Sequence, residues 1–330
     1  MKYKTFFNLF LTGVFVGLLT ACYFFHQPNI TVTALGDNRF STSLIKNYPK
    51  DLAQIHFNGD LVYANFEGVL YEGKSKQNLL SLNMPFSAAD TLERMGVNAL
   101  NLANNHVMDF GAEGYAHTYH YLKNKGFYLS GFNDHGTQMV IRGKKVRIIG
   151  FSFDSPHNVN CLNKAKHLIH SLKDDIIIVS AHMGGENSRG YLIPTGEEYF
   201  DGQKRGDVVK FSHACIDAGA DLVLGHGPHV IRKVELYKNK LIVYSLGNFV
   251  FDYPGAEKNR FSPGIAIKIY LNNKGDFKKA KLMSYSLVKG VPRRDIRQRA
   301  YFFIRKLSST TRNNRLVFQK NGIVTKGDTK

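Results

Sequence analysis

Runs of apolar and β-branched residues, each closed by a turn, predict β-strands along most of the chain. The run 176–180 is continuously apolar up to its last residue, which is typical of a strand buried on both faces. Strands are expected at 30–35, 61–66, 97–102, 176–180, 222–224, 265–271 and 277–287, and hairpins at 139–151 and 230–245.

Helical segments alternate with these strands. Ser87 is placed to cap a helix that Gly96 ends, and Gly126 and Gly219 end two others. Helices are expected at 87–95, 111–125, 162–172 and 207–218. The alternation predicts one large α/β domain, which we place at residues 30–290.

The N-terminus carries the pattern of an export signal. Lys2 and Lys4 precede an apolar stretch that ends in Leu19-Thr20-Ala21-Cys22, which resembles a bacterial lipobox. We therefore expect residues 1–22 to be a lipoprotein signal peptide with Cys22 as the lipidation site. The alternative is an uncleaved transmembrane anchor, because the stretch approaches the ~20 apolar residues that a span needs. Both alternatives attach the domain to membrane lipid in the cell envelope, outside the cytoplasm.

The chain is strongly basic, with a formal net charge of +18 over 330 residues. Such an excess bears on partners rather than on fold. Outside the cytoplasm it argues against nucleic acid and leaves anionic lipid or an anionic polymer as the counter-charge. Residues 291–330 form a basic C-terminal extension in which Tyr301-Phe302-Phe303-Ile304 predicts an amphipathic helix. This helix is expected either to lie on the membrane or to pack on the domain.

Cys161 and Cys215 remain if Cys22 is acylated. An oxidising compartment would allow them to pair. Cys215, however, lies in an apolar helical stretch, and a buried free cysteine behaves as a small hydrophobic residue. We expect both thiols to be free.

Side chains that bind metals gather where the expected strands end. In α/β sheets, ligands bind beyond the carboxyl ends of the strands. Each residue alone is explained by a turn or by a satisfied core position, but five separate strand ends carry such groups. The residues concerned are Asp37, Asn65, Glu67, Asn104, Asn105, His106, Asp109, His182, His226 and His229.

This set of side chains predicts a centre for one or two divalent metal ions. Imidazole and carboxylate together suit Mn, Zn or Fe, whereas an all-oxygen site would suit Mg or Ca. Two such ions lie ~3.5–4 Å apart and clamp the attacking and leaving oxygens of a displacement at phosphorus. A histidine that does not bind metal can protonate the leaving group.

Five ordered motifs carry a family resemblance. They are Leu61-Val62-Tyr63-Ala64-Asn65-Phe66-Glu67-Gly68, Asn101-Leu102-Ala103-Asn104-Asn105-His106 with Asp109 and Gly111, Asp217-Ala218-Gly219-Ala220-Asp221, Gly225-His226-Gly227-Pro228-His229-Val230, and Tyr244-Ser245-Leu246-Gly247-Asn248-Phe249. Together they resemble the bacterial capsule biosynthesis protein CapA family, the poly-γ-glutamate synthesis proteins. That family is similar to the calcineurin-like metallophosphoesterases.

The resemblance implies a four-layer α/β/β/α sandwich with a metal site at one edge. Carried over by motif, Asp37 would hold the first metal and Glu67 would bridge, while Asn105 and His182 would bind the second metal. His226 and His229 would complete the ligand set and His106 would be the general acid, with Asn65, Asp109 and Asn248 in support. Two positions depart from the phosphoesterase pattern. Asn38-Arg39-Phe40 follows Asp37 without a histidine, and two residues instead of one separate the closing histidines His226 and His229.

The leading functional hypothesis is a membrane-anchored component of capsule or poly-γ-glutamate biosynthesis or export with a metal-dependent, phosphoesterase-like hydrolase site. Its partners would be membrane lipid, an anionic polymer or phosphate ester, and membrane subunits. One alternative is a non-catalytic scaffold or polymer-binding subunit of the same machinery. The other is a cell-envelope metallophosphoesterase unrelated to capsule.

Overall fold

The computed structural model describes residues 29–71, 82–131, 135–186, 190–252, 262–311 and 314–327. The expected signal peptide and Cys22 lie outside these residues. Within them, no helix is both long enough and apolar enough to cross a membrane. Cys161 is exposed and Cys215 is buried, and both are free, as expected.

The larger sheet has ten strands and contains the N-terminal strand near its middle. Its order is β17-β18-β15-β14-β1-β2-β3-β4, with β13 beside β1 and β16 beside β15. The strands are β1 (Ile30–Arg39), β2 (Leu61–Phe66), β3 (Ala99–Asn101), β4 (Tyr128–Ser130), β13 (Asn248–Phe251), β14 (Ser262–Leu271), β15 (Phe277–Val288), β16 (Val291–Arg294), β17 (Leu316–Phe318) and β18 (Ile323–Lys326). Strands β1 to β4 run parallel, so their carboxyl ends share one edge.

The smaller sheet has six strands in the order β11-β12-β10-β7-β6-β5. These strands are β5 (Thr137–Ile141), β6 (Lys144–Ser152), β7 (Ile176–His182), β10 (Leu222–His226), β11 (Val234–Tyr237) and β12 (Lys240–Val243). A separate hairpin, β8 (Glu198–Phe200) and β9 (Gln203–Gly206), follows β7.

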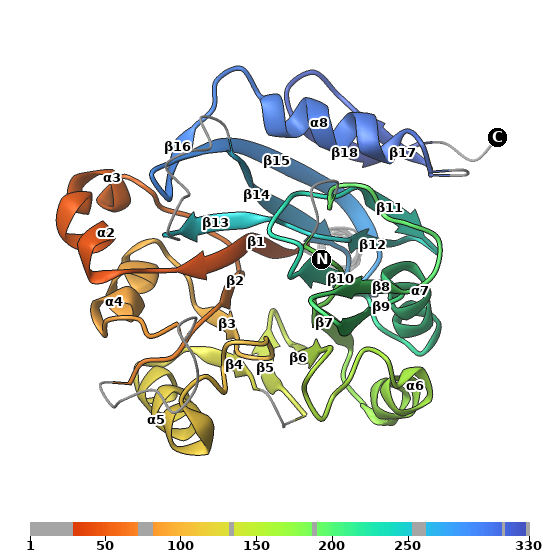
Figure 1. The fold of residues 1–330 in the computed structure, drawn as a ribbon. Helices are drawn as coiled ribbons and strands as arrows, with labels where there is room; N and C mark the ends of the chain where they lie inside the picture. The colour runs from red at the N-terminus through yellow and green to blue at the C-terminus, as the bar shows by residue number, and fades with distance from the viewer. Residues whose placement is uncertain are drawn as a thin grey trace, which may run out of the picture.

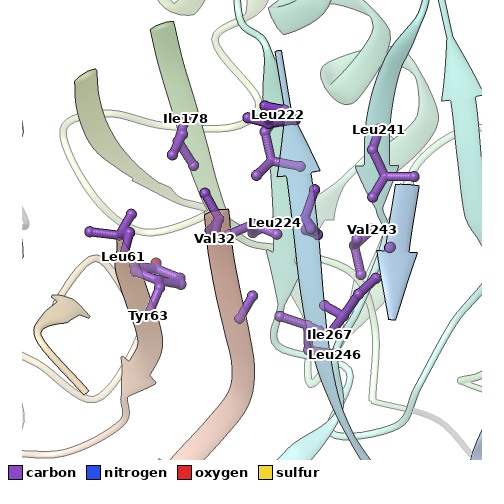
Figure 2. Close-up of a cluster of buried hydrophobic side chains, with 14 of the residues drawn as sticks. Val32, Leu61, Tyr63, Ile178, Leu222, Leu224, Leu241, Val243, Leu246 and Ile267 are labelled. Carbon is purple, nitrogen blue, oxygen red and sulfur yellow. The ribbon is translucent and has the colours of Figure 1, made fainter. Parts of the chain in front are cut away.

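Helices cover the outer face of each sheet, and the two sheets pack face to face (Figure 1). Helices α2 (Thr42–Asn47), α3 (Pro49–Ala53), α4 (Ser87–Arg94) and α5 (Gly111–Asn124) cover the larger sheet, and α6 (Leu162–Ser171) and α7 (Val208–Asp217) cover the smaller one. Between the sheets, side chains such as Val32 and Ile267 meet Ile178 and Leu224 (Figure 2). The four-layer α/β/β/α sandwich is therefore confirmed.

Strands with two covered faces explain why the sequence shows continuous apolar runs rather than alternation. All seven residues of β7 are buried, as are all six of β2. The four expected helices are confirmed to within about two residues, which is the usual uncertainty at helix ends. The short elements α2, α3, β4 and the β8–β9 hairpin were not expected.

The basic C-terminal segment joins the fold and contains strands for which there was no signal in the sequence. Strand β16 pairs with β15, and the β17–β18 hairpin extends the same sheet. These strands are three or four residues long and partly exposed, so they leave no apolar run in the sequence. Helix α8 (Arg299–Ser308) buries Tyr301 and Ile304 against the core between the sheets, so it packs on the domain.

Candidate metal centre

Strand β1 brings Asp37 to the edge where the two sheets meet. The strand continues past the expected end at residue 35, and a register shift lies between Asp37 and Asn38. Asp37 then has Asn65 of β2 on one side and Asn248 of β13 on the other. The preceding Gly36 permits this, because a Cβ there would lie 1.9 Å from the carbonyl oxygen of Gly247.

Strands β7 and β10 of the smaller sheet supply two histidines to the same edge. His182 and His226 are the last residues of these strands and lie opposite each other in the parallel register. The Nδ1 atom of His226 lies 2.9 Å from Oδ1 of Asp37, and both side chains are fully buried. One hydrogen bond therefore joins the carboxyl ends of the two sheets.

Asn65 orients the neighbouring polar groups. Its Nδ2 donates to Oδ1 of Asp37 at 2.9 Å and lies 3.4 Å from both Glu67 Oε2 and His182 Nδ1. Its Oδ1 accepts from Nδ2 of Asn101 at 2.9 Å and from Nδ2 of Asn104 at 3.2 Å. The amide can do this because it offers donors and acceptors at the same time.

Asp37, Glu67 and His182 form a group suited to a cation. Each offers one ligand atom, and these atoms all lie within 4.8 Å of one another in a buried position. Four nearby buried atoms have no hydrogen-bond partner within the structure: Glu67 Oε1, Asn105 Oδ1, His182 Nε2 and His226 Nε2. Leaving such a group unsatisfied costs about 1–3 kcal/mol each. The two oxygens carry lone pairs, and each imidazole nitrogen carries one in the tautomer whose proton is on Nδ1, so the residues fit a divalent ion.

Charge in the centre is balanced by His229. Burial and the charge of Asp37 raise the pKa of Glu67 to about 7. Burial lowers the pKa of His229, but the charge of Glu67 and the hydrogen bond to Asp37 outweigh it and raise that pKa to about 10. Protonated His229 therefore supplies positive charge between two carboxylates, which is the charge that a bound cation would provide.

His182 and Asp37 are in the states that metal binding requires. Burial holds the pKa of His182 well below its ordinary value, so its imidazole is neutral. Burial opposes ionisation of Asp37, but hydrogen bonds from His226 and His229 hold its pKa far below the ordinary range. Metal ligands must be deprotonated in this way.

His106 lies at the mouth of the centre and is partly exposed. Its Nδ1 is 2.9 Å from Oδ2 of Asp109, which also accepts from the backbone amide of Leu82 at 2.7 Å. Burial lowers the pKa of His106, but the hydrogen bond to Asp109 and the charge of Glu67 raise it above its ordinary value overall. The geometry leaves Nε2 of His106 free of these contacts and able to carry a proton.

Comparison with known proteins agrees with the motifs. The profile of the family described as "Bacterial capsule synthesis protein PGA_cap" matches residues 31–253. The chain belongs to this family. It is 30% identical over 254 residues to "Capsule biosynthesis protein CapA" of Bacillus anthracis, which covers 69% of this chain and 61% of that protein. It is 30% identical over 241 residues to "PGA biosynthesis protein CapA" of Bacillus subtilis (strain 168), which covers 66% and 60%.

The chain thus spans about 60% of the length of these family members. A solved structure described as a novel phosphatase from Mycoplasma pneumoniae has the same fold, with a TM-score of 0.50 and 15% sequence identity over 84% of this chain and 99% of that chain. The resemblance to the CapA family and the calcineurin-like phosphoesterase fold are both confirmed.

The structure brings most of the expected site residues of this family member together. Contacts link Asp37, Asn65, Glu67, His182, His226, His229 and Asn248, with Nδ1 of His229 lying 2.9 Å from Oδ1 of Asn248. His229 has φ of 56°, in the left-handed region, and this aims its ring back at the carboxylates. Asn105 contributes an unpartnered oxygen, and His106 lies beside Asp109. The individual roles of these residues stay predictions.

Two charged residues at the rim were not expected from the sequence. Oε2 of Glu186 lies 3.6 Å from Nε2 of His229, and Oε1 of Glu186 lies 3.1 Å from Nη1 of Arg205. Glu186 lies among glycine and polar residues, and Arg205 follows Lys204 in a chain with 44 Lys and Arg, so no sequence pattern marks either residue.

A buried ion pair holds the backbone that carries this rim. Arg232 is fully buried and donates to both carboxylate oxygens of Glu198 at 2.7 Å. It also donates to the carbonyl oxygens of Gly185 and Gly190, and the amide of Gly185 donates to Glu198 at 2.9 Å. Every group of the pair is thus satisfied by the segment after β7.

We expect Arg232→Met to lower the free energy of unfolding by about 3–5 kcal/mol, because it leaves the Glu198 carboxylate buried without its partner. Chemical denaturation measures the change. Arg293→Met is the matched control, since Arg293 pairs with Asp51 in a largely exposed position and such pairs contribute about 0–1 kcal/mol. Equal losses in the two variants would contradict the role of the buried pair.

Proposed function

We propose that this capsule-synthesis family member is a metal-dependent hydrolase of the cell envelope that acts on an oxyanionic ester during production of an anionic capsule polymer. The observation that carries the proposal is the set of buried, unpartnered ligand atoms around Asp37, Glu67 and His182. A structural role alone gives no reason to bury so many acceptors without donors.

The residues divide into those that would hold the metal and those that act on the substrate. The groups that would hold one or two ions of Mn, Zn or Fe are the fully buried Asp37, Glu67, His182 and His226 and the buried side-chain oxygen of Asn105. When bound, such an ion polarises a phosphoryl oxygen and activates water near neutral pH.

This chain's own groups complete the chemistry. His106 would hold the proton for the leaving group on its exposed side, and Asp109 would fix the ring through Nδ1. Asn65 would keep Asp37 and Glu67 in place by hydrogen bonding, as partners of metal ligands commonly do.

The family members' names support a role in capsule and PGA biosynthesis, and the phosphatase fold supports the reaction class. The word "accessory" in the name of one relative, a probable polyglutamine synthesis accessory protein, supports a second, non-catalytic function. In that alternative the chain would be a scaffold or polymer-binding subunit without catalysis. The net charge of +18 suits an anionic polymer in either case.

We further propose attachment to membrane lipid through Cys22. Helix α8 and the residues before it support an orientation close to anionic lipid, because this segment exposes both apolar and basic side chains: Ile296, Arg297, Phe302, Arg305 and Lys306.

Anchoring through Cys22 predicts two effects of Cys22→Ser in cells grown with a fatty-acid label. The variant should no longer incorporate the label, and in a Triton X-114 partition it should leave the detergent phase. Cys161→Ser is the matched control, since Cys161 is an exposed, free thiol of the folded domain. Incorporation of the label into Cys22→Ser would show that the anchor is not at Cys22.

Metal binding predicts that Glu67→Gln and His182→Ala lose the stoichiometric divalent metal of the parent protein, measured by plasma mass spectrometry after dialysis. Asn65→Leu is expected to bind metal about 10- to 100-fold more weakly, because it removes an orienting partner. Glu235→Gln changes a buried carboxylate outside the centre, bonded to His213 and Tyr244, and should keep the metal. Unchanged metal content in Glu67→Gln would refute the assigned centre.

Catalysis predicts that the metal-loaded protein hydrolyses an activated phosphate ester and that His106→Ala lowers kcat by about 100- to 10,000-fold, the range for loss of a general acid. His56→Ala, which changes an exposed histidine bonded to the Arg94 carbonyl, should leave kcat unchanged. No hydrolysis by a protein that holds its metal would favour the scaffold alternative.

A further inference from the structure

We propose that Arg205 is the oxyanion-binding residue of the substrate site and that the Glu186 carboxylate occupies its place until substrate arrives. This inference rests on the proposed function, because it assigns the substrate's anionic group to a position beside the metal centre. The ligand chemistry is a phosphate or a carboxylate, each of which a guanidinium recognises through paired hydrogen bonds.

Arg205 differs from an ordinary surface arginine because its guanidinium is buried and has a donor without a partner. It is only 3% exposed, and its guanidinium carbon lies 3.9 Å from the centroid of the Phe153 ring. Its Nε is buried with no hydrogen-bond partner in the described structure, while Nη1 donates to Glu186. A guanidinium offers five donors, so this one has unused capacity at a place where water is largely excluded.

The Glu186 carboxylate lies in the position that an anionic ligand would occupy. One oxygen accepts from Arg205 at 3.1 Å, and the other lies 3.6 Å from His229. Its side chain is 23% exposed, against 4% for that of Arg205, so the carboxylate is the partner that can leave. An incoming oxyanion would replace the Glu186 carboxylate on the Arg205 guanidinium with another negatively charged group.

The position borders the metal centre on two sides. Nε2 of His229 is 3.4 Å from Oε1 of Glu67, and the Phe153 ring under Arg205 lies 6.1 Å, centroid to centroid, from the His182 ring. Glu186 and Arg205 therefore lie beside the donor set, with Glu186 partly exposed. A substrate bound there would have its anionic group on Arg205 and its scissile ester near Glu67.

The backbone around Arg205 is fixed before any ligand binds. The amide of Gly184 donates to the carbonyl oxygen of Arg205 at 2.8 Å, and the Arg232–Glu198 pair holds Gly185. Strand β9 is thereby tied to the segment that carries Glu186. Preorganisation of this kind favours binding because less freedom is lost on association.

Calorimetric titration of the full-length, detergent-solubilised protein with inorganic phosphate tests the proposal, and a short γ-linked glutamate oligomer is the second probe. We expect Arg205→Met to weaken binding of the preferred probe at least about tenfold, the loss typical of a charge-assisted hydrogen bond. Glu186→Gln should tighten binding several-fold, because it removes the competing charge. Arg147→Met and Glu197→Gln, which alter ion pairs with Asp174 and Lys204, should leave affinity unchanged.

Comparison of the two probes separates a phosphate ester from a carboxylate polymer as the ligand, since Arg205 dependence should appear for one of them. Unchanged affinity for both probes in Arg205→Met and Glu186→Gln overturns the proposal. Should Arg205→Met fail to fold, as judged by its thermal transition, unchanged affinity in the partly exposed Glu186→Gln still overturns it.

Repeating the titrations with and without chelator distinguishes this inference from the proposed function. Phosphate binding that depends on Arg205 in a protein lacking metal and hydrolysis would support the subsite and refute the hydrolase. Normal metal content and hydrolysis in Arg205→Met, with unchanged KM and phosphate affinity, would refute the subsite and leave the hydrolase standing.

Discussion

The hydrogen bond between Asp37 and His226 is the contact on which the rest of the site depends, because it joins two sheets at their carboxyl ends. A carboxylate this deeply buried is costly unless it is paired or binds a cation. The protein meets that cost with two imidazoles and the Asn65 amide. The same closeness that satisfies Asp37 brings Glu67 and His182 within reach of one ion. Stability and ligand geometry are thus set by one arrangement.

That arrangement is possible because the interior between the sheets is apolar up to the last residues of the strands. Figure 2 shows Val32, Leu61 and Ile178 packed in this layer, and the polar residues begin only beyond it. Helix α8 and residue Asn314 bond to β11 of the smaller sheet, while β16 to β18 belong to the larger one. The C-terminal segment therefore fixes the two sheets against each other at a distance from the metal centre.

The sequence was enough to predict the sandwich, through the family resemblance of its ordered motifs, and the gathering of polar residues at one edge, because those residues follow strand ends. It was not enough to predict the bulge after Asp37, since register shifts leave no composition signal, or the short edge strands β16 to β18. Glu186 and Arg205 were missed for a related reason. Their position beside the centre depends on the β8–β9 hairpin and the segment before it. The Arg232–Glu198 contact that holds this hairpin joins residues 34 apart in sequence. Such pairings are visible only in three dimensions.

The buried charges of this protein fall into two groups, and the difference between them is informative. Every guanidinium nitrogen of Arg232 has a hydrogen-bond partner in a site closed to solvent, so the fold is able to provide partners for a buried ion. Among the described residues, Glu67 Oε1, His182 Nε2 and His226 Nε2 have no hydrogen-bond partner, and only Glu67 Oε1 has an ion-pair contact, with His229 at 3.4 Å. Because both kinds of site are equally buried, lack of space or of donors in general does not explain the second. Glu67 and His182 also belong, with Asp37, to the group whose ligand atoms lie within 4.8 Å of one another, so a bound cation would give these buried groups the partner they lack.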